Sequence, residues 1–318
     1  MELLKLENIS FAYDKKNILS DLNLSVNKGE FISLLGSSGC GKTTALRLIS
    51  GFLNPQKGNI FIDGQLQNGV LPNKRKVGMV FQDYALFPHL TVEQNLYYGL
   101  KIKKDFRKKK EQIHQLVLET ARILGIENYL NRLPAELSGG QQQRVALGRS
   151  LVLKPEILLM DEPLSSLDAN LRLRVREELK EIQQKLRITT VYVTHDQEEA
   201  LYLSDRIAVM NEGGIVQYDT PQKIYFEPES KFVAEYTGRA NFLKLEGKTV
   251  LVRPEWITVN DSGDLQAQVM WSQFLGEKTR IGVKAGDDLI TIDLPCTQEI
   301  PKKGQRIKLK IECKKPIY

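Results

Sequence analysis

The sequence predicts an α/β fold on a mainly parallel sheet, with a helical lobe inserted into the sheet and a small all-β barrel after it. Strand-length apolar runs alternate with amphipathic helices through most of the chain, which is typical of parallel sheets. From about residue 82 to 153 the pattern is mostly helical, and after residue 237 it changes to short alternating strands. We therefore expect two domains, 1–237 and 238–318, with a helical subdomain at about 82–153 in the first.

The first domain contains strand-length apolar runs that end on glycine or acidic residues. The run 31–35 closes on a glycine-rich loop, and 43–50 continues as a helix with Leu46 and Ile49 facing inward. Gly51 has the conformational freedom that the end of such a helix requires. Further strands are expected at 157–160, 190–194 and 206–210.

The tail consists of short alternating segments separated by turn residues. Gly286-Asp287-Asp288 is one such turn, and 261–264 is another. Several short strands at this spacing predict a small β-barrel. The expected strands are 249–252, 266–271, 279–283, 289–294 and 306–311.

Composition is ordinary for a globular protein, and it excludes several classes. No run approaches the ~18 consecutive apolar residues of a transmembrane helix. The N-terminus lacks the basic and apolar regions of a signal peptide, so we expect cytoplasmic residence with membrane contact through another protein. Three scattered cysteines support neither a disulfide framework nor a metal cluster. They are Cys40, Cys296 and Cys313.

The chain carries a net charge of +6, and its densest basic run is 101–110. A solvated surface is the simplest interpretation of this run. Contact with acidic lipid or with a partner loop is the alternative.

A glycine-rich loop follows the first buried strand. Residues 36–43 fit the phosphate-binding pattern G-x-x-x-x-G-K-[ST] between a strand and a helix. Glycines let successive N–H groups face a phosphate, and the helix N-terminus adds positive potential. Lys42 would reach the β- and γ-phosphates of a nucleotide, and the Thr43 hydroxyl would ligate Mg²⁺. The candidate nucleotide-binding residues are Gly36, Ser37, Ser38, Gly39, Cys40, Gly41, Lys42, Thr43 and Thr44.

Two carboxylates end the apolar strand 157–160. Asp161 suits an Mg²⁺ position, through a water molecule. Glu162 is the better general base, because it lies one residue beyond the metal position and near the γ-phosphate. This pattern is weak alone, and together with the phosphate loop it indicates a nucleotide-hydrolysing enzyme.

A second candidate phosphate site begins at Ser138. This serine is placed to cap a helix that Gly139 and Gly140 open, so several N–H donors are left free. One nucleotide cannot easily occupy both sites of one chain. The second site therefore fits a nucleotide that another copy of the chain holds. The residues expected to contact that nucleotide are Ser138, Gly139, Gly140 and Gln141.

The order of these motifs resembles the ATPase subunits of ABC transporters, and the resemblance covers nearly all of 1–237. It implies that Gln82 senses Mg²⁺ and water, that His195 contacts the γ-phosphate, that Tyr13 stacks on adenine, and that 165–168 form the D-loop. It implies three catalytic residues, Glu162, His195 and Gln82. It also implies three residues near the metal, Thr43, Gln82 and Asp161.

Simpler interpretations exist for single residues. From the residues alone, Tyr13 could be an ordinary strand aromatic, and a histidine that ends an apolar strand is by default a core residue. Gly148, inside the second-site helix, costs about 1 kcal/mol against alanine unless it serves close packing.

The resemblance implies a head-to-tail homodimer that binds ATP and Mg²⁺ and joins two integral membrane permease subunits at the cytoplasmic face of the membrane. A periplasmic or lipoprotein solute-binding protein would act indirectly. The motifs at 238–243 and 252–255 resemble the small C-terminal oligonucleotide-binding-like (TOBE-type) β domain of importer ATPases. Within that set, 168–172 and 194–200 look most like ferric-iron and polyamine importers, with iron first; sulfate, phosphonate and sugars are further alternatives.

Two other classes of function compete with transport. A DNA-associated ATPase would share the second-site motif and suit the basic charge, but such enzymes carry long coiled-coil insertions, and this chain has no sustained heptads, so we expect no nucleic-acid partner. A regulatory role of the β tail is the second alternative, since barrels of this kind bind many ligands.

Overall fold

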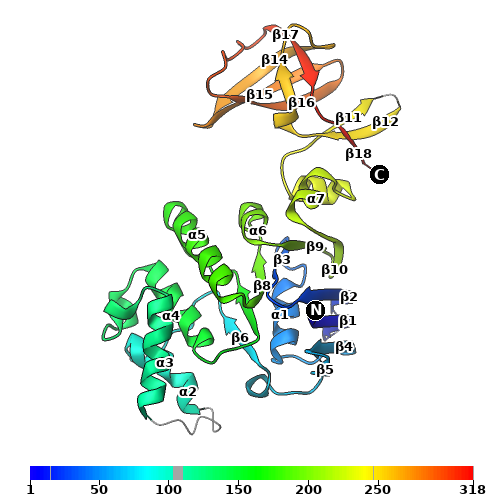
Figure 1. Cartoon of the computed structure of the whole chain (residues 1–318). Coiled ribbons are helices and arrows are strands. Elements are labelled where there is room, and N and C mark those ends of the chain that lie inside the picture. The colour runs from blue at the N-terminus through cyan, green and yellow to red at the C-terminus, as the bar shows by residue number, and fades with distance from the viewer. Residues whose placement is uncertain (15, 103–109, 246, 318) are drawn as a thin grey trace. The chain divides into compact units, whose positions relative to one another are not determined.

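The computed structural model describes residues 1–14, 16–102, 110–245 and 247–317. They form two compact units, Met1–Pro221 and Gln222–Tyr318 (Figure 1). Most of the basic run 101–110 lies outside the described residues. The predicted fold class is confirmed, with an α/β unit that contains a helical lobe and an all-β domain after it.

The first unit is built on a six-stranded sheet with the strand order β10-β9-β3-β8-β7-β6. Five of these strands are parallel, and β10 runs antiparallel at one edge. Every residue of β3, β7 and β8 is buried, which is the pattern of a sheet covered on both faces. The strands are β3 (Phe31–Gly36), β6 (Val77–Val80), β7 (Ile157–Asp161), β8 (Thr189–Thr194), β9 (Arg206–Asn211) and β10 (Gly214–Asp219).

A second, antiparallel sheet with the order β2-β1-β4-β5 belongs to the same unit. Alternate residues of its long strands are buried and share one core with β3 and the first helix, with Leu6, Leu34 and Leu46 among its members. The strands are β1 (Glu2–Tyr13), β2 (Lys16–Asn27), β4 (Lys57–Ile62) and β5 (Gln65–Leu66).

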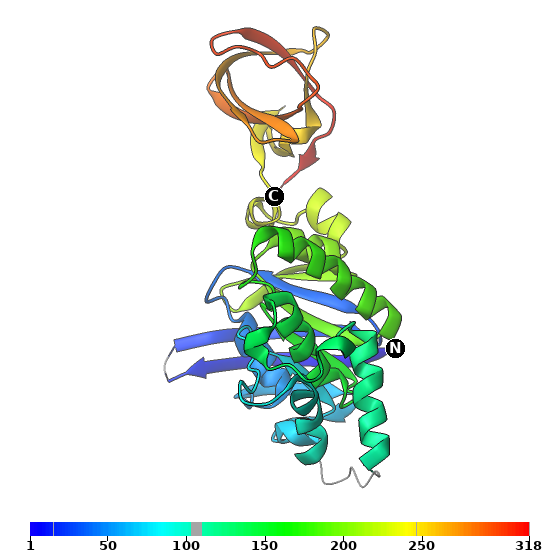
Figure 2. The ribbon, with the colours of Figure 1, turned by 90° about the vertical axis from the view of Figure 1, so that its left-hand side faces the viewer.

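In the helical lobe α2, α3 and α4 pack together, and their core continues onto the six-stranded sheet (Figures 1 and 2). Gly148 lies where α4 packs closely on its neighbours. A Cβ there would lie 2.6 Å from Leu96 and 2.9 Å from Leu124, so the close-packing alternative for this glycine holds. The helices of the unit are α1 (Lys42–Ser50), α2 (Val92–Ile102), α3 (Lys110–Ile123), α4 (Gly139–Leu151), α5 (Ala169–Leu186) and α6 (Gln197–Leu203). Single 3₁₀ turns lie at Pro72–Lys74, Glu127–Tyr129 and Pro134–Glu136.

Helix α1 is closed at its C-terminal end by one buried side chain. Arg75 donates hydrogen bonds to the carbonyl oxygens of Leu48 and Ile49, both at 2.7 Å. These carbonyls belong to the last turn of α1, where backbone N–H donors run out, although Leu48 also accepts from the N–H of Gly51 at 3.2 Å. Arg75 therefore fixes the end of the helix whose N-terminus opens at the phosphate loop.

The second unit contains two short helices and two antiparallel sheets. The larger sheet, β13-β17-β14-β15-β16, curls until its edge strands β13 and β16 meet, so it forms the ring of strands seen in Figure 2. The elements are α7 (Pro221–Phe226), α8 (Lys231–Tyr236), β11 (Asn241–Leu245), β12 (Lys248–Val252), a 3₁₀ turn Pro254–Trp256, β13 (Ile257–Val259), β14 (Leu265–Phe274), β15 (Lys278–Ala285), β16 (Asp288–Pro295), β17 (Arg306–Ile311) and β18 (Lys315–Pro316).

The contacts divide the chain between Pro221 and Gln222, earlier than the boundary expected at residue 237. Helices α7 and α8 precede the change to strand patterns but pack with the β domain. Ala234 of α8 lies in the core of that domain, and Phe226 of α7 stacks on Trp256 at 5.9 Å. Composition changes at Gly238, whereas packing changes at the start of α7.

Arg253 joins these helices to the β domain. Its side chain is 0% exposed, and its hydrogen bonds come from its two terminal nitrogens, whereas its Nε has no partner among the described residues. The guanidinium donates to the carbonyls of Tyr225, Ala234 and Arg239 and to the Thr237 hydroxyl. It also stacks over the Tyr225 ring at 4.3 Å.

We expect Arg253→Met to destabilise the second unit by about 3 kcal/mol, because several buried carbonyls lose their donors. Urea unfolding followed by tryptophan fluorescence measures this unit selectively, since both tryptophans of the chain, Trp256 and Trp271, lie in it. Arg306→Met, at an exposed arginine of β17, is the matched control and should change stability by less than about 0.5 kcal/mol. Equal midpoints for the two variants would contradict the role of Arg253.

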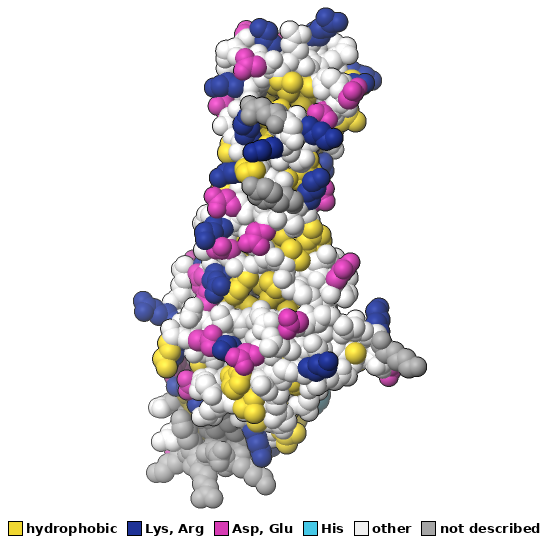
Figure 3. Space-filling model, turned by 90° about the vertical axis from the view of Figure 1, so that its right-hand side faces the viewer, with side chains coloured by type: hydrophobic (Ala, Val, Ile, Leu, Met, Phe, Trp, Pro, Cys, Tyr) yellow, Lys and Arg dark blue, Asp and Glu magenta, His cyan; other side chains and the backbone are white. Residues whose placement is uncertain are grey.

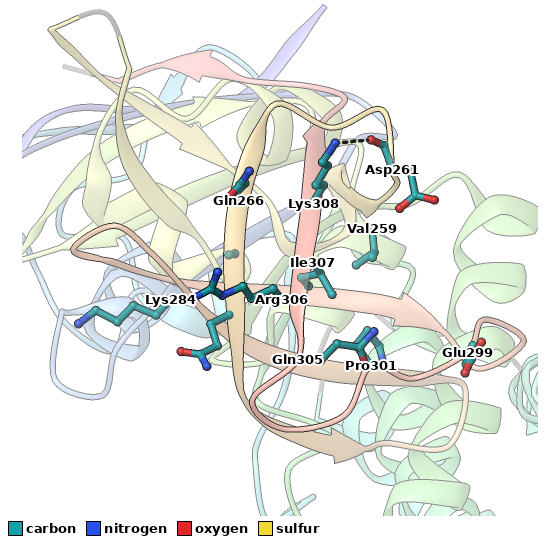
Figure 4. A pocket seen from close by; sticks show the side chains of 12 residues that line it. Val259, Asp261, Gln266, Lys284, Glu299, Pro301, Gln305, Arg306, Ile307 and Lys308 are labelled. Atoms are coloured by element: carbon teal, nitrogen blue, oxygen red, sulfur yellow. Dashed lines mark hydrogen bonds between the residues drawn. The ribbon is translucent and has the colours of Figure 1, made fainter.

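An open hollow of about 670 Å³ lies beside β14 and β17 (Figure 4). Its lining mixes the basic side chains of Lys284, Arg306 and Lys308 with the acidic ones of Asp261 and Glu299. The Lys308 ammonium donates to the backbone oxygen of Asp261 at 3.1 Å. A regulatory ligand of the tail would find polar groups here.

Candidate functional site

The candidate site lies where the parallel strands of the first unit end. The phosphate loop follows β3, and the pair Asp161 and Glu162 ends β7. His195 follows β8, and Gln82 follows β6. Because the carboxyl ends of parallel strands share one edge of a sheet, four distant segments of the sequence converge here.

Lys42 is buried at the first turn of α1, with 5% of its surface exposed. Its ammonium donates to the carbonyls of Gly36 and Ser37, at 2.6 and 2.9 Å. The side chain therefore closes back over the loop and holds its charge where the loop amides gather. Two glycines at positive φ, Gly39 (+85°) and Gly41 (+104°), allow the turn.

Thr43 and Asp161 meet across the site, where the Thr43 hydroxyl donates to Asp161 Oδ1 at 2.9 Å. Burial raises the pKa of the Asp161 carboxyl, and the Thr43 hydrogen bond and the charges of Arg47 and Lys42 oppose that shift. No cluster of three His, Cys, Asp or Glu side chains that could hold a metal occurs among the described residues. One hydroxyl and one carboxylate fit Mg²⁺, which keeps water molecules and takes its remaining oxygens from phosphates.

Glu162 and His195 form a pair in which Nδ1 of the histidine lies 3.0 Å from Oε2 of the glutamate. The Glu162 backbone has φ of +44°, a left-handed conformation that is uncommon for residues other than glycine and that concentrates at functional sites. The His195 side chain is 55% exposed. His195 is therefore not a core histidine, which was the default interpretation from the residues alone.

A buried carboxylate, Glu199, supports the loop that carries His195. It accepts hydrogen bonds from the hydroxyls of Tyr192, at 2.7 Å, and Thr194, at 2.8 Å. The same Thr194 oxygen accepts from the backbone N–H of Asp196 at 2.9 Å. Burial raises the pKa of the Glu199 carboxyl. The sequence analysis did not single out Glu199. Its position in the first turn of α6, on the side that faces the sheet, could have indicated a buried glutamate.

We expect Glu199→Ala to lower ATP turnover by about tenfold while ATP affinity stays within about twofold, since the His195 loop loses its anchor and the phosphate loop is untouched. Turnover and nucleotide affinity, measured separately, check this. Glu198→Ala, at the exposed neighbouring glutamate, is the control and should change neither. A uniform loss of both quantities in Glu199→Ala would show general unfolding instead.

The structure brings Gln82 and Tyr13 to the surface. Gln82 is exposed in the turn after β6, and Tyr13, 41% exposed at the end of β1, contacts Phe11 edge-on with ring centroids 4.9 Å apart. An exposed aromatic ring at this place leaves a face free for stacking. The role of each residue stays a prediction.

The second candidate phosphate site is the N-terminus of α4. Ser138 and Gln141 form a reciprocal cap, in which each side chain bonds the backbone N–H of the other residue at 3.4 and 2.9 Å. The intervening glycines pack closely on their own chain: a Cβ at Gly139 would lie 2.9 Å from Leu167, and one at Gly140 would lie 3.1 Å from Val175. Ser138 is exposed, so the helix N-terminus faces outward.

The structure thus brings together one group of predicted residues and leaves another apart. Hydrogen bonds and loop geometry connect the phosphate loop, Asp161, Glu162 and His195. The N-terminus of α4 has neighbours in its own lobe and in the segment from Leu164 to Val175. In Figure 1, α4 and α1 lie on opposite sides of β6. Within one chain, the two phosphate sites do not form one centre.

Comparison with known proteins identifies relatives over nearly the whole chain. The family model described as ABC transporter matches residues 19–165. The chain is 42% identical to the Fe(3+) ions import ATP-binding protein FbpC of Fusobacterium nucleatum, across 97% of this chain and 91% of that protein. It is 43% identical to the spermidine/putrescine import ATP-binding protein PotA of Mesoplasma florum, across 86% of each.

A solved structure agrees with these relatives. The ATP-binding cassette MJ0796, in a dimeric post-hydrolysis state bound to ADP and phosphate, is 31% identical with a TM-score of 0.60 and covers 69% of this chain and 99% of its own. The described residues contain no helix long and apolar enough to cross a membrane. The phosphate loop, the acidic end of β7 and the cap of α4 occur here in one chain, and this chain belongs to the ATP-hydrolysing, ATP-binding subunits of ABC transporters.

Proposed function

We propose that two copies of this chain bind two MgATP molecules between them, head to tail. The phosphate loop of one copy and the α4 N-terminus of the other would face the same triphosphate. The exposed serine-capped end of α4 supports this most strongly, because its free N–H groups and dipole favour an anion that its own phosphate loop cannot present. The dimeric state of the MJ0796 relative is consistent with the arrangement.

The roles of the site residues follow from their contacts. Thr43 and Asp161 would hold Mg²⁺, with Gln82 near it, and Lys42 would move from the loop carbonyls to the β- and γ-phosphates. Glu162 would accept the proton of the attacking water, while His195 orients that carboxylate and contacts the γ-phosphate. Release of phosphate removes charge from the interface and weakens it.

An aromatic surface near Gln82 is the proposed contact for two membrane permease subunits. Phe52 is 56% exposed and lies 6.2 Å from Phe81 between ring centroids. Tyr98, 40% exposed, packs on Phe87 at 4.3 Å. Exposed aromatic rings that are held by neighbours are common anchors of protein interfaces. This contact would hold the chain at the cytoplasmic face of the membrane.

The cargo that we propose is ferric iron, taken up by an importer. The relative with the greater coverage imports Fe(3+) by its name, and polyamine import is the alternative favoured by the PotA relative. A binding protein outside the membrane would deliver the solute to the permeases. ATPase activity of the complex with permeases in vesicles, stimulated by iron-loaded but not by spermidine-loaded binding protein, would support iron; the reverse would favour polyamines.

A DNA-associated function receives less support. On the face in Figure 3, Lys and Arg side chains are interspersed with Asp and Glu side chains over the described residues. Proteins that track nucleic-acid backbones present basic stripes of one sign. Binding of duplex DNA that weakens steeply with salt would favour that alternative.

The shared-site proposal is tested by mixing two inactive variants. Lys42→Ala damages the phosphate loop, and Ser138→Arg blocks the α4 N-terminus. A mixed dimer contains one site with both parts intact, so mixing is expected to restore ATP hydrolysis that neither variant shows alone. If the mixture has only the averaged activity of its components, while subunit exchange is shown by light scattering or crosslinking, the proposal is wrong.

A further inference from the structure

A cavity in the first unit lies away from the candidate site. It has a volume of about 390 Å³, within the range of small-molecule sites. Its lining includes Glu156 and Thr189, which stand at the amino ends of β7 and β8. The phosphate loop, Glu162 and His195 follow the carboxyl ends, so this cavity lies at the opposite edge of the sheet.

The walls of the cavity are mostly apolar and come from both parts of the unit. Leu116 and Ile123 lie on one face of α3, in the helical lobe. Leu3 lies on β1 of the antiparallel sheet, and Leu186 ends α5. A ligand held here would contact the helical lobe and the sheet together.

The mouth of the cavity is basic. Lys28, Lys154 and Arg187 border it, are exposed, and carry no ion pair among the residues that the structure describes. Two acidic residues also border it, of which Glu156 is paired with Lys76 at 2.5 Å and Glu119 is exposed. Free positive charge therefore exceeds free negative charge at this mouth.

A second hollow, of about 550 Å³, adjoins the first and shares Lys28 and Arg187 with it. Asp205, the one acidic residue that lines it in the described part of the chain, accepts a hydrogen bond from the backbone N–H of Phe31 at 2.8 Å. The apolar cavity thus adjoins a polar hollow. Lys28 and Arg187 line both of them, and neither forms an ion pair among the described residues.

We propose that this cavity binds an amphipathic carboxylate, with its alkyl chain between α3 and the amino ends of β7 and β8 and its head group between Lys28 and Arg187. The apolar walls provide burial for the chain. The two cations provide charge-assisted hydrogen bonds to the head. The site is separate from nucleotide binding, so it extends the proposed function and does not depend on it.

Isothermal titration calorimetry of the full chain without nucleotide tests the cavity. Dodecanoate, kept below its micelle concentration, is expected to bind at one molecule per chain. Octanoate carries the same head on a shorter chain, and its affinity should fall by about fourfold for each methylene lost from the cavity. Absence of dodecanoate binding, or equal affinity for the two acids, overturns the proposal.

The head-group contact is tested by charge reversal. The double variant Lys28→Glu/Arg187→Glu is expected to bind dodecanoate at least about tenfold more weakly. Lys57→Glu, at an exposed lysine of β4, is the matched control and should bind like the unmodified chain. Dodecyltrimethylammonium, with the opposite charge, should bind more weakly than dodecanoate; equal binding of the two, or an unaffected double variant, overturns the assignment.

Discussion

Replacing Glu162 with glutamine is expected to lower ATP turnover by about 10²- to 10⁴-fold, the usual contribution of a general base. The amide keeps the size of the side chain and an oxygen 3.0 Å from His195 but cannot accept the proton of water. ATP affinity should persist, because Lys42 and Thr43 bind through other groups. Phosphate release at saturating MgATP measures the loss.

Glu212→Gln is the matched control for this substitution. Glu212 also follows a parallel strand, β9, and its φ of +45° is close to the +44° of Glu162, so the same chemical change meets the same backbone strain. It is exposed and has no place in the candidate site. Turnover should therefore be unchanged in this variant, and a similar loss in both would remove the catalytic assignment of Glu162.

The same variant reports on assembly. If two copies share each nucleotide, Glu162→Gln should accumulate a dimer in MgATP, because phosphate contacts form and hydrolysis no longer breaks them. Gel filtration with and without MgATP measures this shift. A Glu162→Gln chain that binds ATP but elutes as a monomer would refute the shared site while leaving the role of Glu162 as a base intact.

The parts of the site that the sequence predicted are local. The phosphate loop needs glycines between a strand and a helix, and the cap of α4 needs a serine three residues before a glutamine. Both patterns lie within a few residues, so the structure reproduces them at Gly39, Gly41, Ser138 and Gln141. Such a prediction does not depend on how the motif packs against distant parts of the chain.

The parts that were missed depend on contacts between distant residues. Arg75 is 26 or more positions from the carbonyls that it closes at the end of α1, and nothing in its own neighbourhood indicates burial. Glu199 lies close to Thr194 in sequence, but its burial depends on how α6 packs on the sheet. The contact-based boundary differs from the expected one for a similar reason, since Ala234 belongs to a core formed by later residues.

Lys42→Ala is the second substitution with a large expected effect, at least a tenfold loss of ATP affinity, since each hydrogen bond to a charged group contributes about 1.5–3 kcal/mol. The Lys42 ammonium is already buried among carbonyls before ATP binds. The free energy of removing it from water is therefore part of folding and does not weaken ATP binding. Equilibrium binding of a fluorescent ATP analogue measures the change.

Two further variants separate charge from geometry. Lys42→Arg retains the charge, but its planar guanidinium cannot reproduce the compact ammonium that fits between the Gly36 and Ser37 carbonyls, so it should also bind ATP weakly. Lys57→Ala removes an exposed lysine of the same unit and should leave affinity unchanged. Full affinity in Lys42→Arg would show that positive charge alone is needed, whereas full affinity in Lys42→Ala would mean that the loop amides bind the phosphates unaided.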